Sequence, residues 1–480
     1  MNSQFPLFKL IDVEIYERPV LLRLPFKFGV VTLTHCPQAF VRVKLESASG
    51  KVYEGVSAEM MAPKWFDKNL ALTNEDNFNQ LRHVLLLARD AYLSQSSFCS
   101  AFNFFATNYA DHQVQCAKFG YNALLANYGP ALLDRAILDA LCIAEKCSIY
   151  EAFRHNRVGI ESVSKPSFHD FSNLNIENFL QELKPSSFVA ARHTVGMVDP
   201  ITQGDIKASV NDGLPESLDQ VVEKYGHTYF KLKVGGHLGA DIERLKAIAS
   251  VLDQSKQPYF ASLDGNEQYE DVDQIAELVS QMHQEPSLKR LTSSILFIEQ
   301  PINRQSALLS DVRSSKLNLP VIIDESDDSL DTFLTAKKCG YVGISSKSCK
   351  GIYKSILNAT RCRRWNEAGS ALNYFMTGED LTTQAGISVQ QDLALVNLLG
   401  IQHVERNGHH YVNGMAALSE SEQATFWEAH PDLYEQSHGA VRLKIVNGRI
   451  NLSSLDCVGF ATKVQPEFKS MQLLKLQSNQ

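Results

Sequence analysis

Hydrophobic and polar positions give the first part of the chain the pattern of strands followed by helices. Apolar and polar residues alternate there in short runs, which is typical of half-buried strands. We expect antiparallel strands over residues 10–20, 28–34, 39–47 and 51–60, with a hairpin turn at SASGK. Helical periodicity follows over residues 79–93 and 129–156. Strands followed by helices indicate a separate α+β domain.

Near residue 188 the pattern changes to short apolar runs that alternate with helical segments. The apolar runs cover residues 188–197, 228–234, 259–266, 294–301, 319–326, 341–346, 371–377 and, more weakly, 401–408. The helical patterns cover residues 241–254, 271–283, 329–339, 352–369 and 389–400. A repeating strand–helix unit implies parallel strands. Seven or eight such units favour a closed barrel over an open sheet.

These patterns predict three parts of the chain. The N-terminal α+β domain covers residues 1–165, the barrel covers 166–415, and a C-terminal segment covers 416–480. Residues 157–187 are polar, and we interpret them as a linker or an insertion. The last part is strand-like again over residues 441–454, and we expect it to pack back on the first domain.

The composition is ordinary for a globular protein, with 44% hydrophobic and 21% charged residues. A formal net charge of −8 argues against a broad nucleic-acid surface. Nine scattered cysteines without a CxxC pair fit a reducing compartment. There is no signal-peptide pattern, and no apolar run approaches the ~20 residues of a membrane span. We therefore expect a cytoplasmic protein that binds neither nucleic acid nor membrane.

Three consecutive predicted strands end in an acidic residue. YFASLDGN supplies Asp264, SILFIEQP supplies Glu299, and LPVIIDES supplies Asp324. The carboxyl ends of parallel barrel strands lie on one face about 4.8 Å apart, so these carboxylates can converge. One acid after a strand is more often a helix cap or a loop residue. Three crowded anions instead call for a cation, and all-oxygen ligands suit Mg²⁺.

Two strands end in basic residues. In TYFKLKVGG, Lys231 and Lys233 lie on the same side of a strand because side chains alternate. Two neighbouring like charges, or a nearby metal ion, lower the pKa of a lysine, and such a lysine can act as a base. YVGISSKSCKG offers Lys347 or Lys350 across the barrel. A substrate could therefore lie between two lysines.

The pieces FKLKVGG, LDGN, IEQP, IIDES and the lysine after the sixth strand, in this order, resemble the enolase superfamily. The resemblance is strongest to its mandelate racemase and muconate-lactonizing branches, and it covers most of the chain. It implies an α/β fold in which an α+β capping domain covers a modified TIM barrel, (β/α)7β. It also implies that Asp264, Glu299 and Asp324 are ligands of Mg²⁺.

The resemblance further implies two catalytic lysines. Lys233 corresponds to one acid/base, and Lys347, which lies 23 residues after Asp324, corresponds to the opposite one. The family usually has two glycines after that lysine, whereas SKSCKGIYK has one, and an ungapped comparison places Ser345 there. Ser345, Lys347 and Lys350 therefore remain alternatives at this position.

Three further residues match supporting positions of the family. Lys231 would be a catalytic residue that helps to hold the substrate carboxylate, Asn266 would contact the substrate, and Glu325 would support the metal site.

The chemistry implied by the resemblance is Mg²⁺-dependent removal of the proton α to a carboxylate through an enediolate intermediate. Return of a proton by the opposite lysine would make the chain a racemase or epimerase, and ring closure would make it a cycloisomerase. A leaving group β to the carboxylate would give a dehydratase, that is, a lyase. We expect a small-molecule carboxylate substrate and a homo-oligomer.

Specificity should come from the capping domain and the last strand ends. HVERNGHHYVNG offers Glu405, His409 and His410 as substrate contacts, although a solvated glycine turn explains the same residues. This sequence lacks the Asp-x-Asp that dipeptide epimerases carry there. LNYFMTGED offers Glu379 and Asp380 without the histidine partner of sugar-acid dehydratases, so we rank dehydration lower.

Two other classes of protein remain open. One is a catalytically silent metal-binding homologue, which the altered lysine motif after the sixth strand favours. The other is a metal-dependent aldolase or hydrolase on an unrelated barrel, which would use the acids without paired lysines.

Overall fold

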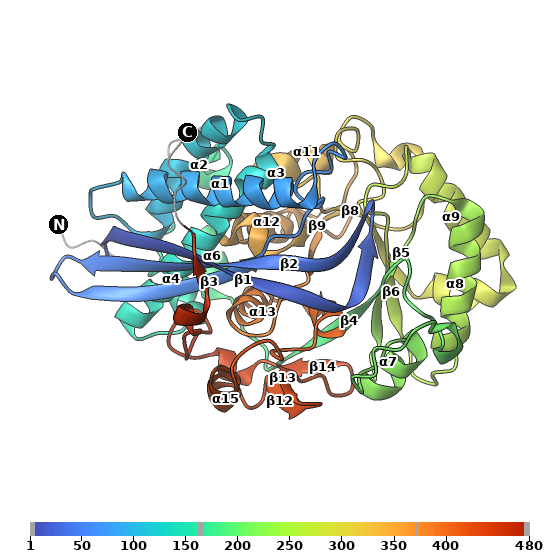
Figure 1. The fold of residues 1–480 in the computed structure, drawn as a ribbon. Helices are drawn as coiled ribbons and strands as arrows, with labels where there is room; N and C mark the ends of the chain where they lie inside the picture. The colour runs from blue at the N-terminus through green and yellow to red at the C-terminus, as the bar shows by residue number, and fades with distance from the viewer. Residues whose placement is uncertain (1–4, 162–167, 370–371, 475–480) are drawn as a thin grey trace.

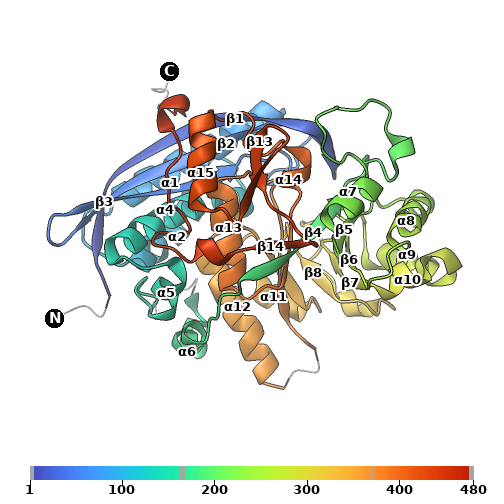
Figure 2. The ribbon, with the colours of Figure 1, turned by 90° about the horizontal axis from the view of Figure 1, so that it is seen from below.

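The computed structural model describes residues 5–161, 168–369 and 372–474. An N-terminal antiparallel sheet with its helices forms one body, and a closed parallel barrel forms the other (Figure 1). The two views together place this sheet across part of the barrel, as a cap (Figure 2). No helix in the described ranges combines the length and the apolar character that crossing a bilayer requires.

The cap sheet has the strand order β15-β1-β2-β3. Its strands are β1 (Phe8–Phe28), β2 (Val31–Ser47), β3 (Val52–Met60) and β15 (Gln472–Leu473). The hairpin expected at SASGK is present, with the Ser47 amide donating to the Lys51 carbonyl at 2.9 Å. The strand expected over residues 28–34 is wrong at its start, because Gly29 turns the chain with φ +47° between β1 and β2.

Helices cover one face of the cap sheet. They are α1 (Asn74–Leu93), α2 (Ala101–Ala117), α3 (Ala123–Ala126), α4 (Tyr128–Glu145) and α5 (Ile149–Arg154). The single helix expected over residues 129–156 is two helices. Lys146 adopts a left-handed conformation that ends α4, and the Ser148 hydroxyl caps the start of α5.

Eight parallel strands form the barrel, which confirms the predicted fold class. They are β4 (Phe188–Val195), β5 (Tyr229–Lys233), β6 (Phe260–Asp264), β7 (Ile295–Glu299), β8 (Val321–Ile323), β9 (Gly343–Ser346), β10 (Phe375–Gly378) and β11 (His403–Glu405). Each strand pairs with the next, and β11 pairs with β4 to close the barrel.

Helices surround the barrel strands (Figure 2). They are α7 (Leu218–Tyr225), α8 (Leu238–Leu252), α9 (Val272–Gln284), α10 (Lys289–Ser293), α11 (Thr332–Lys338), α12 (Ile352–Glu367) and α13 (Ile387–Leu398). The polar segment that we interpreted as a linker contains the short helix α6 (Ile176–Gln181), and its residues 162–167 lie outside the described residues.

The C-terminal segment contacts both bodies. The helix α14 (Gly408–Tyr411) precedes it, and its own elements are α15 (Glu420–Ala429), β12 (Tyr434–Ser437), β13 (Ala440–Leu443) and β14 (Arg449–Asn451), followed by β15. Strand β14 extends the barrel sheet by pairing with β4, whereas β15 pairs with β1 of the cap. The single strand expected over 441–454 is two strands: β13 pairs with β12, and β14 pairs with β4 of the barrel, whereas the pairing with the cap comes from β15 further along the chain.

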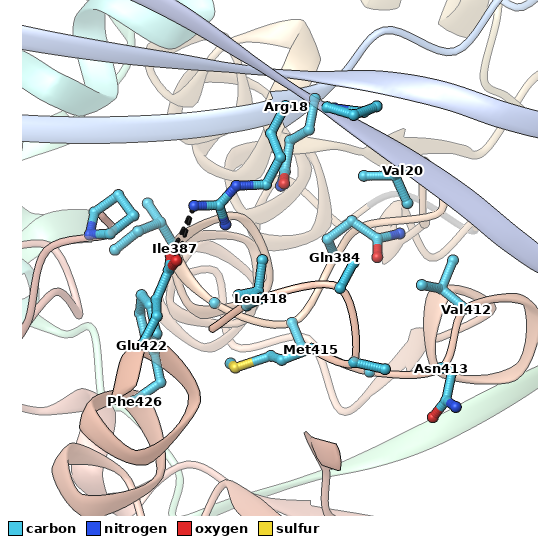
Figure 3. A pocket seen from close by; sticks show the side chains of 18 of the residues that line it. Arg18, Val20, Gln384, Ile387, Val412, Asn413, Met415, Leu418, Glu422 and Phe426 are labelled. Atoms are coloured by element: carbon cyan, nitrogen blue, oxygen red, sulfur yellow. Dashed lines mark hydrogen bonds and ion pairs between the residues drawn. The ribbon is translucent and has the colours of Figure 1, made fainter. Parts of the chain in front are cut away.

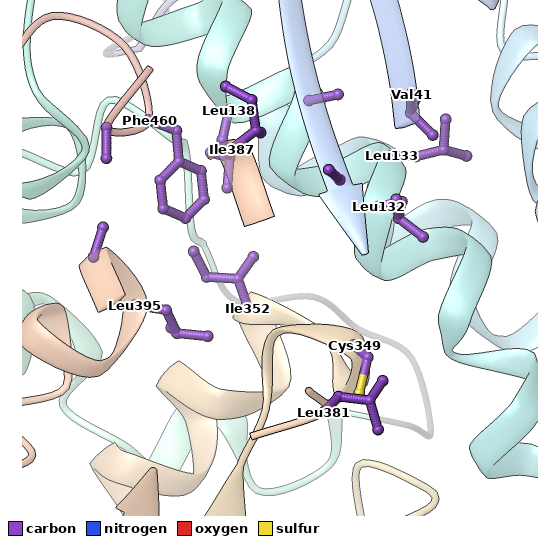
Figure 4. Close-up of a cluster of buried hydrophobic side chains, with 14 of the residues drawn as sticks. Val41, Leu132, Leu133, Leu138, Cys349, Ile352, Leu381, Ile387, Leu395 and Phe460 are labelled. Atoms are coloured by element: carbon purple, nitrogen blue, oxygen red, sulfur yellow. The ribbon is translucent and has the colours of Figure 1, made fainter. Parts of the chain in front are cut away.

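One hydrophobic core runs from the cap into the barrel. Val41 of β2 and Leu132 of α4 face Ile352 of α12 and Leu395 of α13, and Phe460 of the C-terminal segment closes the cluster (Figure 4). A second core lies between the remaining barrel strands and helices such as α8 and α9. The continuous core fixes the cap over the carboxyl ends of the barrel strands.

Candidate active site

The ends of β5, β6 and β7 bring the predicted polar residues together inside the barrel. Lys231 and Lys233 share one face of β5 because side chains alternate along a strand. The strand registers pair Lys233 with Asp264, and Asp264 with Glu299. All four side chains are buried. Asp264 and Glu299 therefore lie on neighbouring strands at the same level of the barrel.

Lys231 lies among four carboxylates. Its Nζ is 2.9 Å from Asp264 Oδ2 and 2.8 Å from Glu299 Oε2. It is also 2.7 Å from Glu379 Oε2 and 3.0 Å from Glu405 Oε2. Burial lowers the pKa of Lys231, but these carboxylates raise it well above its usual value. Around Lys231 the carboxylates therefore outweigh the lowering of its pKa that we expected from the neighbouring lysine.

Lys233 is held by two oxygen atoms. Its Nζ donates to Asp264 Oδ2 at 2.5 Å and to Asn266 Oδ1 at 2.6 Å. Asn266 adopts φ +39° in the turn after β6, and its Nδ2 donates to Glu325 Oε1 at 3.0 Å. Asn266 thus connects the lysine of β5 to the acid that follows Asp324.

Asp324 is held by two amines and a hydroxyl. Lys347 Nζ lies 2.6 Å from Asp324 Oδ2, Lys350 Nζ lies 2.9 Å from Oδ1, and the Ser345 hydroxyl also donates to Oδ1. Burial raises the pKa of Asp324, but Lys347 and Lys350 hold it well below the usual range. The Gln300 side chain fixes the turn, because its Oε1 accepts from the Asp324 amide at 2.8 Å.

The geometry separates the three alternatives for the position after the sixth strand. Lys347 lines the cavity at the carboxyl ends of the strands, and its Nζ lies 4.3 Å from the centroid of the Trp65 ring. Among the described residues, Ser345 and Lys350 do not line this cavity. Lys350 instead donates to the Asp324 and Ser345 carbonyls. The amine that faces the cavity is therefore that of Lys347.

The cap closes this cavity. Its volume is about 20 Å³, room for about one water molecule. Its lining comprises Phe26, Phe28, Ala62, Trp65, Lys231, Lys233, Asn266, Lys347, Asp380, Leu381, Thr382, Glu405 and Asn407. The first four of these belong to the cap and its connecting loop. This volume is far below that of ordinary ligand sites, so residues of the lining would have to move for a substrate to bind.

The acids have the chemistry of a Mg²⁺ site. Burial, together with the charges of Asp264 and Glu379, raises the pKa of Glu299 well above its usual value. This surplus of negative charge is what a divalent cation would neutralise. Asp324 binds Lys347 and Lys350. Among the described residues, the carboxylate oxygens of Asp264, Glu299 and Asp324 do not all lie within 4.8 Å of one another.

The structure separates His409 and His410 from this cavity. Both belong to the short helix α14, and neither contributes to the described lining. His410 is only 4% exposed, so the interpretation as a solvated turn is also wrong. Glu405, which we grouped with them, is the residue that reaches the site, where it binds Lys231. The expected substrate contacts of the two histidines are not supported by their positions.

Sequence reasoning missed two residues of the site. Arg192 on β4 is buried, forms an ion pair with Glu379 and donates to the Gly378 carbonyl at 2.9 Å. The sequence feature that could have identified Arg192 is a charged residue inside the apolar run FVAARHTV. Trp65 covers the site from a loop that no periodicity marks.

A larger cavity, of about 480 Å³, lies between the cap sheet and the C-terminal segment (Figure 3). Apolar side chains such as Val20, Met415 and Phe426 line it. Its charged residues Arg18 and Glu422 bind each other at 2.9 Å. It lacks the paired lysines and acids, so the candidate chemistry belongs to the smaller cavity in the barrel.

A family model described as "Enolase C-terminal domain-like" matches residues 213–465. A comparison with curated proteins found no match. Solved structures match over nearly the whole chain at low sequence identity. Muconate lactonizing enzyme from Mucobacterium Smegmatis, complexed with muconolactone, is 14% identical with a TM-score of 0.63, covering 97% of this chain and 100% of the other.

Two other solved structures have the same fold. Dipeptide epimerase from Enterococcus faecalis V583, complexed with Mg and the dipeptide L-Leu-L-Tyr, is 15% identical with a TM-score of 0.58, covering 94% of this chain and 99% of the other. 2-Chloromuconate cycloisomerase from Rhodococcus opacus 1CP is 14% identical with a TM-score of 0.57, covering 97% of each chain. At these identities the likeness establishes the fold.

Proposed function

The chain belongs to the enolase superfamily, in its mandelate racemase and muconate-lactonizing branch, and from this premise we propose that it removes the proton α to a substrate carboxylate in a Mg²⁺-dependent reaction. The proposed outcome is racemisation, epimerisation or cycloisomerisation of a small carboxylate. The similar structures include an epimerase and a cycloisomerase, which supports this class of reaction.

The observation that carries the proposal is a pair of lysines on opposite sides of one cavity. Lys233 ends β5, and Lys347 follows β9, with three strands between them in the barrel. Both line the cavity under the cap. A general base must lie within hydrogen-bond reach of the proton that it removes. Two lysines that face each other across a substrate could remove a proton on one side and return one on the other.

In this proposal the chain's own residues divide the work. Asp264 and Asn266 orient Lys233 Nζ, which takes the α-proton. Lys231 contacts the substrate carboxylate, and the cap residues around Trp65 exclude water. Asp264, Glu299 and Asp324 would hold Mg²⁺. When bound, Mg²⁺ would neutralise the substrate carboxylate and the negative charge that develops next to it.

A catalytically silent homologue is the second candidate. One observation favours it: Asp324 binds both Lys347 and Lys350, so a metal ion would have to compete with two ammonium groups for this carboxylate.

An elimination reaction, with loss of a group β to the carboxylate, would use the same lysines and needs no separate site.

Hydrogen exchange in D₂O tests the proposed reaction. The parent protein with Mg²⁺ should exchange the α-proton of a member of a panel of N-acyl amino acids, α-hydroxy acids and lactone acids, measured by ¹H NMR. The Lys233→Ala variant should lose exchange by about 10²–10⁴-fold, because a positioned base contributes this much. The control Lys246→Ala, at the surface on α8, should exchange like the parent.

The possible outcomes separate the candidates. Exchange that persists in both Lys233→Ala and Lys347→Ala overturns the proposal. Loss in only one of these variants assigns one-sided chemistry to that lysine. A parent protein that binds Mg²⁺ but exchanges no member of the panel supports the silent homologue.

A further inference from the structure

Three histidines from separate segments meet on the outer side of the barrel wall. His193 lies on β4 next to Arg192, and it therefore points away from the barrel interior that Arg192 enters. His227 lies between α7 and β5, and His409 lies in α14 after β11. One ring nitrogen of each histidine lies within 4.8 Å of the others. Among the residues that the structure describes, this is the only group of three or more histidine, cysteine or acidic side chains whose ligand atoms all lie within 4.8 Å of one another.

Two ring nitrogens of this cluster, on His193 and His227, lack hydrogen-bond partners. His193 Nδ1 and His227 Nε2 are buried without a partner among the described residues. His193 is 2% exposed and His227 is 5% exposed. A buried polar atom without a partner destabilises the fold, so two of them in one cluster require an explanation. A shared ligand would satisfy them together.

The hydrogen bond of His227 fixes which of its nitrogens is free. Its Nδ1 lies 2.9 Å from the Ala191 carbonyl oxygen, which can only accept, so Nδ1 carries the proton. Nε2 then carries the lone pair, and Nε2 is the nitrogen without a partner. Metal-bound histidines typically donate their other ring N–H to a carbonyl or a carboxylate in this way.

The surroundings keep the histidines neutral. Burial and the neighbouring histidines lower the pKa of His193 and of His409 well below the usual value. Burial lowers the pKa of His227 to about 4. Neutral imidazole is the form that binds a metal ion. The rings of Tyr225 and His410 lie 5.3 Å from His409 and 5.0 Å from His193 and complete the wall.

We propose that His193, His227 and His409 form a binding site for a divalent transition-metal ion, with Zn²⁺ as the first choice. Three imidazoles suit Zn²⁺, whereas Mg²⁺ prefers oxygen ligands. Zn–N bonds of about 2.0–2.1 Å place tetrahedral ligands about 3.3 Å from one another, a separation within the 4.8 Å limit that the three ring nitrogens meet. The fourth position is left for a water molecule.

The position of the site suggests its effect on the fold. Strands β11 and β4 pair to close the barrel, and His409 and His193 come from the segments on the two sides of this seam. His227 adds the start of β5. A bound ion would connect these three segments. It would therefore stabilise the closed barrel in addition to any role in chemistry.

Cobalt binding tests this site separately from the proposed Mg²⁺ site. Addition of Co²⁺ to chelator-treated protein should give the intense visible absorption of tetrahedral Co²⁺ at one equivalent. Zn²⁺ should remove this absorption, and excess Mg²⁺ should not. Zn²⁺ should also raise the midpoint of thermal unfolding. The Asp264→Asn variant should bind Co²⁺ like the parent, because Asp264 lies inside the barrel.

Variants of the cluster decide the outcome. His227→Gln and His409→Gln should each weaken Co²⁺ binding by about 100-fold or more, while the exposed control His283→Gln should leave it unchanged. His409 is partly exposed, so its variant remains informative if the other fails to fold. Absence of tetrahedral absorption in the parent, or unchanged binding in both cluster variants, overturns the proposal. Neither result bears on α-proton exchange.

Discussion

Arg192 illustrates how single residues sustain a charged barrel interior. Its guanidinium is fully buried, forms an ion pair with Glu379 and lies 5.4 Å from the centroid of the Phe297 ring. Burial lowers the pKa of Arg192, but Glu379, Glu299 and Glu405 raise it above its usual value. A buried charge of this kind is stable only while its partner is present.

Substitution of Arg192 should therefore destabilise the protein strongly. Arg192→Leu leaves Glu379 buried with Lys231 as its remaining cation, and we expect the free energy of unfolding to fall by about 3–5 kcal/mol. Urea unfolding followed by circular dichroism measures the change.

A surface arginine provides the matched control. Arg363 on α12 pairs with Glu367 and Glu182 in solvent, so Arg363→Leu should change the free energy of unfolding by no more than about 1 kcal/mol. A change of that small size in Arg192→Leu would contradict the structural role of the buried ion pair.

At the level of elements, the cap depends on a close approach between β3 and α4. A Cβ atom on Gly55 would lie 2.2 Å from the Ala136 carbonyl oxygen and 2.4 Å from the Ala140 amide nitrogen. Both are backbone atoms of α4, so they cannot move aside alone. Glycine at this position lets the strand lie directly against the helix.

A methyl group at this contact should be costly. We expect Gly55→Ala to lower the free energy of unfolding by about 3 kcal/mol, the upper end of overpacking effects. The control Gly239→Ala, in α8, meets no described atom within 4 Å and should stabilise the helix by up to about 1 kcal/mol. Thermal or urea unfolding compares the two; a neutral Gly55→Ala would show that the strand and helix can separate without loss.

At the scale of the whole molecule, cap and barrel share one core. Ile352 of α12 is fully buried in the cluster that joins β2, α4, α13 and the C-terminal segment (Figure 4). A shared core implies that the two bodies unfold together.

Truncation of this shared core should weaken both bodies at once. We expect Ile352→Ala to lower the free energy of unfolding by about 2–5 kcal/mol. Within each protein, tryptophan fluorescence and far-ultraviolet circular dichroism should give the same urea midpoint as each other. The midpoint of the variant should be lower than that of the parent. Leu309→Ala, at a side chain that is 82% exposed, should change stability by less than about 0.5 kcal/mol. Two separate transitions would contradict a single cooperative unit.

The sequence predicted the barrel and much of the site because both follow local rules. Short apolar runs that alternate with helical runs specify parallel strands, and parallel strands place their carboxyl ends together. Asp264 and Glu299 could therefore be assigned to one level of the barrel from their positions at strand ends. The choice among Ser345, Lys347 and Lys350 could not be made, because it depends on which side chain the turn after β9 directs into the cavity.

The sequence by itself determined the order of elements, the acids at the strand ends and the shared face of Lys231 and Lys233, since each depends on neighbours within one strand. The tertiary structure alone decided that Lys231 is surrounded by Glu379 and Glu405, that Trp65 covers the site, and that His193 and His409 meet. These contacts join segments far apart in the chain. Such pairs are selected by the packing of the whole barrel and cap, which no local period encodes.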